Sequence, residues 1–301
     1  MRITEGVLER GDLTTWYQVV GDLGADDTRS PVVVCHGGPG LTHDYLSPLG
    51  VLAESGRPVV FYDQFGSGRS GHRPGADAAF WTVPLFLREL TDLIAHLGIG
   101  EYHLLGHSWG GMLGLELAAQ APAGLRSLVV ADAFARSRTY SREVAGLVAA
   151  LPEDVRSTIE RHEAAGSTEH PEYQEAVRAF YRLHVCRCRP VPGDVLRTLG
   201  ALAEDPTVYL AMAGPSEFRL TGNLRDWDIT GRLGGVRAEV LIVSGRHDEV
   251  TPGAVAELHA ALPGSRWELI EDASHMPHLE TPGRFLELVE KFLDGADGVR
   301  P

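Results

Sequence analysis

The sequence predicts an α/β fold in which a mostly parallel eight-stranded sheet carries helices on both faces and an inserted helical cap. Three observations lead to this prediction. Two segments of alternating polarity open the chain, six short apolar runs follow, and helical patterns lie between those runs. Strands that alternate with helices are typical of a parallel sheet covered on both faces.

The strand signals are of two kinds. Residues 3–9 and 13–20 alternate apolar and polar side chains, which indicates an antiparallel hairpin. Continuous apolar runs rich in valine and leucine suit strands that are buried on both faces. Six such runs follow the hairpin, at residues 31–35, 58–62, 102–105, 125–130, 240–243 and 267–270.

Helical patterns fill the intervals, at residues 83–97, 112–121, 254–261 and 283–293. From about residue 135 to residue 225 the chain is helical and charged, and it offers no good strand candidate. Five helices are expected in that stretch, at residues 141–150, 152–165, 171–183, 194–202 and 207–212. We therefore expect residues 1–134 and 226–301 to form the core, and residues 135–225 to form a helical cap inserted after the sixth strand.

The composition narrows the class of function. A chain of 301 residues with 44% hydrophobic content forms a large buried core easily. The net charge of −14 argues against a nucleic-acid partner and against binding to an anionic membrane surface, because both need a positive face. The sequence leaves the oligomeric state open and is compatible with a monomer.

Cysteine usage and the N-terminus point to a cytoplasmic enzyme without a metal or cofactor. Three cysteines are too few for a disulfide scaffold, and Cys35 ends an apolar run as a core residue would. Cys186 and Cys188, with His184 nearby, lack the second cysteine pair of a zinc site. The first residues form no apolar signal region, and no window approaches the ~20 apolar residues that span a bilayer.

The sharpest chemical signal is the pentapeptide Gly106-His107-Ser108-Trp109-Gly110. It follows the expected strand 102–105 and precedes a helix expected to begin near Gly111. This G-x-S-x-G pattern between a strand and a helix is the nucleophile elbow, which raises a serine hydroxyl above a sheet. Ser108 is therefore the candidate nucleophile.

A second glycine-rich segment, His36-Gly37-Gly38-Pro39-Gly40, follows the strand 31–35. Acyl transfer produces a tetrahedral oxyanion, which needs backbone N–H donors that no side chain obstructs. This loop is expected to supply one donor, and Trp109, the residue after the nucleophile, the other.

The acid and the base of a serine triad should follow the nucleophile in the order acid, then histidine. Asp248 comes shortly after the strand 240–243, and His275 comes shortly after the strand 267–270. Because the carboxyl ends of parallel strands meet at one edge of a sheet, Ser108, Asp248 and His275 are expected to meet there. This is the arrangement of the α/β-hydrolase fold.

Other residues compete for these roles. His278 is the main rival for the base, and Asp63 and Asp132, which also follow strands, are the rival acids. We prefer His275 because it lies nearer the strand end. Asp63 is expected to hold the turn around Gly66 and Gly68. His103 and His107, which flank the nucleophile strand, are expected either to be packed or to support the catalytic residues without touching the substrate.

The chain resembles the proline iminopeptidases, a family that includes the tricorn-interacting aminopeptidase of archaea and is similar to L-amino acid amidases. The resemblance covers nearly the whole chain and extends into the cap, where sequences of α/β-hydrolases vary most. It rests on residues 36–40, 42–45, 61–70, 106–110 and 248–252, and on the cap segments 171–177, 214–218 and 226–230.

The resemblance implies roles for further residues. Glu217 and Glu249 match, by motif position, two glutamates that bind the free α-ammonium group of the substrate, and Gly38 matches the first oxyanion donor. It implies release of an N-terminal residue, proline or another small apolar one, from short peptides or amino-acid amides. An esterase, a lactonase or an amidase of a secondary pathway, acting on a small molecule, is the alternative; an esterase or lactonase would have no use for the two glutamates.

Overall fold

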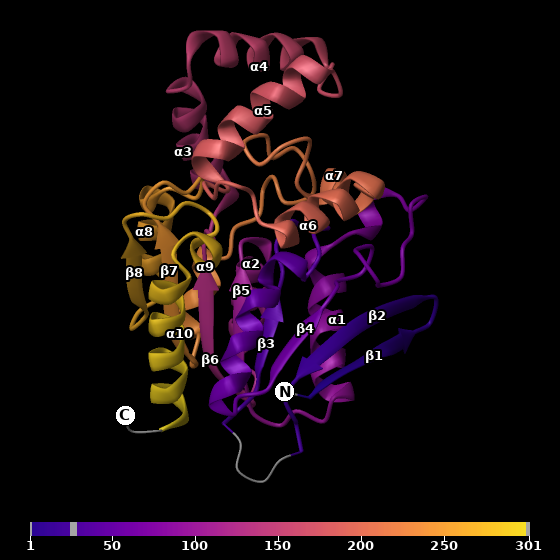
Figure 1. Ribbon diagram of the computed structural model, residues 1–301, viewed down its shortest axis with the longest axis vertical. Coiled ribbons are helices and arrows are strands. Elements are labelled where there is room, and N and C mark those ends of the chain that lie inside the picture. The colour runs from indigo at the N-terminus through magenta and orange to yellow at the C-terminus, as the bar shows by residue number, and fades with distance from the viewer. Residues whose placement is uncertain (1, 25–28, 299–301) are drawn as a thin grey trace.

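The computed structural model describes residues 2–24 and 29–298, and it confirms the α/β-hydrolase fold (Figure 1). An eight-stranded sheet runs in the order β1-β2-β4-β3-β5-β6-β7-β8. The first strand pairs antiparallel with the second and the second antiparallel with the fourth, and the other five pairs are parallel. The strands are β1 Ile3–Arg10, β2 Leu13–Val20, β3 Val32–Cys35, β4 Val59–Tyr62, β5 Tyr102–His107, β6 Leu125–Ala131, β7 Glu239–Gly245 and β8 Arg266–Ile270.

The middle of the sheet is covered on both faces. Every residue of β3, β4 and β5 is buried. Because successive side chains of a strand point to opposite faces, burial of all of them requires packing on both sides. Valine and leucine meet this requirement, as the sequence pattern predicts. In contrast β1, at the edge of the sheet, leaves Ile3 and Val7 exposed (Figure 1).

The register of the parallel strands aligns their carboxyl ends. The last paired residues are Cys35 with Gly106, His107 with Ala131, Ala131 with Val243, and Gly245 with Ile270. Loops that leave β3, β5, β7 and β8 therefore emerge at one edge of the sheet, and this edge is where open α/β sheets bind ligands.

The helices of the core confirm the expected pattern with small shifts. They are α1 Val83–His96, α2 Trp109–Ala118, α8 Pro252–Ala261 and α10 Pro282–Asp297. The nucleophile helix α2 packs against β3, β5 and β6. It begins at Trp109, three residues before the helical pattern in the sequence, because the apolar periodicity starts only after the glycine pair Gly110-Gly111. No helix among the described residues is long and apolar enough to cross a membrane.

Five helices lie between β6 and β7, above the carboxyl edge of the sheet (Figure 1). They are α3 Ser137–Ala149, α4 Glu153–Ala165, α5 Pro171–His184, α6 Gly193–Glu204 and α7 Thr207–Met212. Helices α4 and α5 pack on each other, whereas α6 and α7 contact the core segments η1 Asp44–Ser55 and η2 Ala78–Phe80. We propose residues 135–225 as the cap unit.

The short helical elements were not predicted from the sequence. They are η1, η2, η3 Thr230–Gly235 and α9 Pro277–Glu280. Segment η1 contains Pro48 and Gly50, which disfavour a regular α-helix, so no period of 3.6 residues announces it. It nevertheless buries Tyr45, Leu46 and Leu49.

Candidate active site

The nucleophile elbow occupies the junction between β5 and α2. Ser108 has φ 54° and ψ −122°, a backbone conformation that residues other than glycine rarely adopt. A Cβ at Gly106 would collide with the Gly110 carbonyl group, and one at Gly110 would collide with the Cys35 carbonyl group. The two glycines therefore allow the tight turn that lifts Ser108 above the sheet, where its side chain is partly exposed.

The glycine-rich loop after β3 lies directly beside this serine. Gly38 has φ 110° and lines the same pocket as Ser108 and Trp109. Among the described residues, no protein group accepts a hydrogen bond from the backbone N–H of Gly38 or of Trp109. Two unpaired N–H donors beside a serine can receive the oxygen of a tetrahedral intermediate.

Asp248 and His275 come together from the loops after β7 and β8. His275 Nδ1 lies 2.7 Å from Asp248 Oδ1, and both side chains are buried. The other ring nitrogen, Nε2, is 3.7 Å from Oε1 of Glu249, which lines the pocket together with Ser108. Because Asp248 holds Nδ1, the free nitrogen of the imidazole is the one on the pocket side. No hydrogen bond joins the Ser108 hydroxyl to His275 in the described residues.

The surroundings of His275 favour its protonated form. Burial by itself lowers the pKa of an imidazole. The charge and hydrogen bond of Asp248, together with the charge of Glu217, outweigh burial and raise the pKa of His275 above 6.5. A base of this kind accepts a proton readily and is poised for proton transfer near neutral pH.

His278, the rival base, faces elsewhere. Its Nε2 donates to the backbone carbonyl of Tyr45 at 3.1 Å, and burial lowers its pKa to about 3. Its Nδ1 is buried and has no hydrogen-bond partner among the described residues. Asp248 pairs with His275 instead, so the structure favours His275 over His278 on geometry.

The two rival acids, Asp63 and Asp132, accept hydrogen bonds from neighbouring backbone groups. Asp63 accepts hydrogen bonds from the backbone N–H of His43 and of Arg69, both at 2.9 Å, and so holds the turn that contains Gly66 and Gly68. Asp132 accepts from the backbone N–H of Gly245 at 3.1 Å. Burial, reinforced by the charge of Asp248, raises the pKa of Asp132 well above its usual range. Neither carboxylate is hydrogen-bonded to His275 in the described part of the chain.

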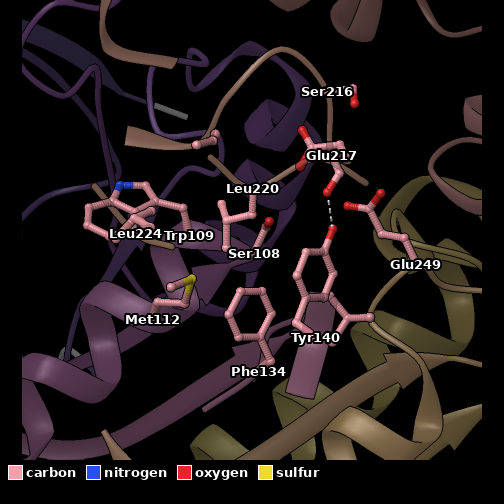
Figure 2. Close-up of a pocket in the computed structure, with 13 residues that line it drawn as sticks. Ser108, Trp109, Met112, Phe134, Tyr140, Ser216, Glu217, Leu220, Leu224 and Glu249 are labelled. Atoms are coloured by element: carbon pink, nitrogen blue, oxygen red, sulfur yellow. Dashed lines mark hydrogen bonds between the residues drawn. The ribbon is translucent and has the colours of Figure 1, made fainter. Parts of the chain in front are cut away.

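Glu217 and Glu249 both line the pocket, one from the cap and one from the loop after β7 (Figure 2). Tyr209 donates its hydroxyl to Glu217 Oε1 at 2.8 Å, and Tyr140 donates to the Glu217 backbone carbonyl at 2.6 Å. Glu249 is 1% exposed, and its Oε2 has no hydrogen-bond partner among the described residues.

In the described part of the chain, the cationic group beside the two carboxylates is the imidazole of His275, whose Nε2 lies 3.7 Å from Glu249 Oε1. No described arginine or lysine forms an ion pair with either of them. Burial raises the pKa of Glu217, and burial together with the charges of Glu217 and Asp248 raises the pKa of Glu249 well above its usual range. A buried carboxylate with an unpaired oxygen, as at Glu249, is costly, so its place in a pocket beside the half-buried Glu217 points to a cationic ligand.

The remaining pocket wall is mostly apolar. Its side chains come from α2, from the end of β6 and from the segment after α7, and they are Trp109, Met112, Phe134, Leu220 and Leu224 (Figure 2). Apart from Trp109, these wall residues were not predicted from the sequence, and neither were Tyr140 and Tyr209. Phe134, Leu220 and Leu224 lie on irregular segments, which carry no periodic signal. The helical periodicity of α2, α3 and α7 does not show which of their residues face a pocket.

Comparisons with known proteins agree with this geometry. A family described as "alpha/beta hydrolase fold" matches residues 30–282. The proline iminopeptidase of Saccharolobus solfataricus is 37% identical over 98% of this chain and 93% of its own length. The proline iminopeptidase of Lactobacillus delbrueckii subsp. lactis is 36% identical over 99% of this chain and all of its own.

Two solved structures are similar along their whole length. The crystal structure of VinJ superposes with a TM-score of 0.95 at 48% sequence identity, covering 97% of this chain and 99% of that one. The proline iminopeptidase of Mycobacterium smegmatis superposes with a TM-score of 0.90 at 42% identity, covering 98% and 99%.

Proposed function

The chain belongs to the α/β-hydrolase family and, within it, to the proline iminopeptidases, and from this premise we propose that it is a serine aminopeptidase. It releases an N-terminal residue, proline or another small apolar one, from short peptides or amino-acid amides. The reaction passes through an acyl-enzyme on Ser108 and needs no cofactor.

The observation that carries the proposal is the pair Glu217 and Glu249 next to Ser108. An exopeptidase must recognise a chain end, and two partly or fully desolvated carboxylates hold an ammonium group through charge-assisted hydrogen bonds. Fixing the amine decides which carbonyl group lies against Ser108, so only the first residue is released. A neutral ester or lactone would leave Glu249 with its buried oxygen unpaired.

Acylation begins when the Ser108 hydroxyl turns toward His275 Nε2 and attacks the carbonyl carbon of the anchored residue. His275 takes the hydroxyl proton, while Asp248 keeps Nδ1–H oriented and stabilises the imidazolium. The backbone N–H groups of Gly38 and Trp109 stabilise the oxyanion. His275 then gives its proton to the leaving amine, the C–N bond breaks, and an ester to Ser108 remains.

Deacylation repeats these steps with water. His275 removes a proton from a water molecule that attacks the ester, the same two N–H groups hold the second oxyanion, and Ser108 leaves with the proton. The freed amino acid still has its ammonium group between Glu217 and Glu249. The apolar wall from Trp109 to Leu224 suits a small apolar side chain such as the prolyl ring.

Turnover of an aminoacyl anilide and of its N-acetylated form tests the proposal. Acetylation removes the positive charge but leaves the scissile bond unchanged. We expect prolyl and alanyl anilides to be hydrolysed and their acetylated forms to lose most of the turnover. Equal turnover of both forms would favour the esterase or lactonase class over the aminopeptidase.

A further inference from the structure

Beneath the proposed active site lies a buried chain of hydrogen bonds that the reaction steps above do not use. It joins Gly37, next to the proposed oxyanion donor, to His275 through the side chains of Tyr45 and His107. Tyr45 belongs to η1, and His107 is the last residue of β5, directly before Ser108. Both side chains are buried.

The distances define the chain. The backbone N–H of Gly37 donates to Tyr45 Oη at 2.8 Å. Tyr45 Oη lies 2.7 Å from His107 Nδ1, and His107 Nε2 lies 2.6 Å from the backbone carbonyl oxygen of His275. The segment after β3 and the loop after β8 are thus joined to the end of β5 by three short hydrogen bonds.

The direction of each hydrogen bond follows from the chemistry of the groups. A carbonyl oxygen can only accept, so His107 Nε2 carries the hydrogen and donates to His275. Burial and the neighbouring His275 and His278 hold the pKa of His107 well below its usual range, so the ring is neutral. Nδ1 is then an acceptor, and Tyr45 donates to it while accepting from Gly37. Every donor in the chain has an acceptor.

The position of Gly37 explains why such a chain is useful. A Cβ at this residue would lie 2.9 Å from Tyr45 Oη and 3.1 Å from Ser108 Cβ, so the loop is wedged between the tyrosine and the nucleophile. A glycine-rich loop loses much conformational entropy when it is ordered, and it has few side chains with which to fix itself. An oxyanion hole works only when its donors are oriented in advance.

We propose that Tyr45 and His107 are positioning residues that hold the oxyanion loop and the loop of the base in one arrangement around Ser108. Tyr45 orients the peptide that precedes the Gly38 N–H, and His107 ties the backbone of His275 to the nucleophile strand. This inference rests on the proposed function, because it assumes that Ser108 is the nucleophile and His275 the base.

The test measures the rate at which diisopropyl fluorophosphate modifies Ser108, followed by intact mass. This reagent needs an activated serine and an oxyanion hole, but it carries no ammonium group and so does not depend on Glu217 or Glu249. The variants are Tyr45→Phe, His107→Asn and the double variant. The control is Tyr62→Phe, which removes another buried hydroxyl that donates only to Cys35 Sγ, at 3.4 Å.

We expect each single substitution to slow the modification roughly 10- to 100-fold, the range for a buried group left without its partner. The double variant should be at most about threefold slower than the slower single variant, because either change breaks the same chain. Tyr62→Phe should react at the wild-type rate even if its thermal unfolding midpoint falls as far as that of Tyr45→Phe.

Two results would overturn the inference. One is a folded Tyr45→Phe or His107→Asn protein that reacts within about twofold of the wild type. The other is a double variant whose loss equals the product of the two single losses. His107→Asn decides the question alone if Tyr45→Phe does not fold. A wild-type protein that the reagent leaves unmodified would instead remove the nucleophile, whereas failure of the anilide test alone leaves this inference standing.

Discussion

Replacing Glu249 with glutamine tests the proposed ammonium anchor. Glutamine has nearly the same shape but no charge. Glu249 Oε1 lies 3.7 Å from His275 Nε2, so the substitution also removes a carboxylate beside the proposed base. A substrate without an ammonium group uses the same base, and its rate serves as the control for that effect.

The magnitude follows from the burial of this carboxylate. Hydrogen bonds to charged groups contribute about 1.5–3 kcal/mol, which corresponds to roughly 10- to 150-fold in kcat/KM at ~1.4 kcal/mol per decade. Because Glu249 is 1% exposed, solvent screens it little, and we expect a loss in the upper half of that range.

The same substitution should stabilise the fold. Burial raises the pKa of Glu249 above its value of 4.5 in the unfolded chain, so the folded state binds more protons and its free energy of unfolding falls as pH rises from 4.5 through the folded pKa. Glutamine does not titrate, so the free energy of unfolding of the variant lacks this fall. At pH 8 the variant should unfold at a higher temperature than the wild type, by about 2 °C for each kcal/mol relieved.

The assay compares kcat/KM on prolyl anilide with kcat/KM on an N-acetylated ester, together with the thermal unfolding midpoint at pH 8. The anchor accounts for the result if kcat/KM falls only for the free-amine substrate and the thermal unfolding midpoint rises. Equal losses on both substrates would refute the reasoning, as would a wild-type rate on the free-amine substrate.

Three further outcomes are expected. Ser108→Ala should abolish turnover and leave the far-UV circular dichroism spectrum unchanged; residual activity above about a thousandth of wild type would remove the nucleophile assignment. The rate should fall at acid pH as His275 becomes protonated, with a midpoint above 6.5. Glu217→Gln should move that midpoint to lower pH, because Glu217 raises the pKa of His275. A rate profile that stays flat from pH 5 to 8 would contradict the role of His275. Asp132→Asn should keep activity on prolyl anilide within about threefold, because burial and the charge of Asp248 raise the pKa of the Asp132 carboxyl well above its usual range and so favour its protonated form, which an amide resembles closely. A loss of two orders of magnitude would show that Asp132 acts as a charged acid.

The strands of the core were predictable because burial on both faces requires a continuous run of apolar residues in the sequence. Val32, Val33 and Val34 form an unbroken apolar run, and all three are almost completely inaccessible. Segment η1 shows no comparable pattern, since Pro48 and Gly50 interrupt any helical period. Its importance comes from Tyr45, whose contact with His107 spans 62 positions of sequence.

The residues of the candidate site also fall into two groups, those that the local sequence could predict and those that it could not. Ser108, Asp248 and His275 follow strand ends, where local sequence reports their place in a parallel sheet. Glu217 was assigned through family resemblance, because nothing local distinguishes it from other acidic residues of the cap. Tyr209 and Tyr140, which hydrogen-bond to Glu217, reach it only through the folding of the cap over the sheet.

A crystal structure of the Ser108→Ala protein with a bound prolyl dipeptide is the most direct test of how the proposed site holds its substrate. We expect the substrate ammonium to lie between Glu217 and Glu249, within about 3 Å of each carboxylate. We also expect the scissile carbonyl oxygen to point toward the N–H groups of Gly38 and Trp109, with His275 Nε2 facing the leaving nitrogen. A dipeptide bound with its amine in solvent and its carboxyl end against the two glutamates would contradict the account.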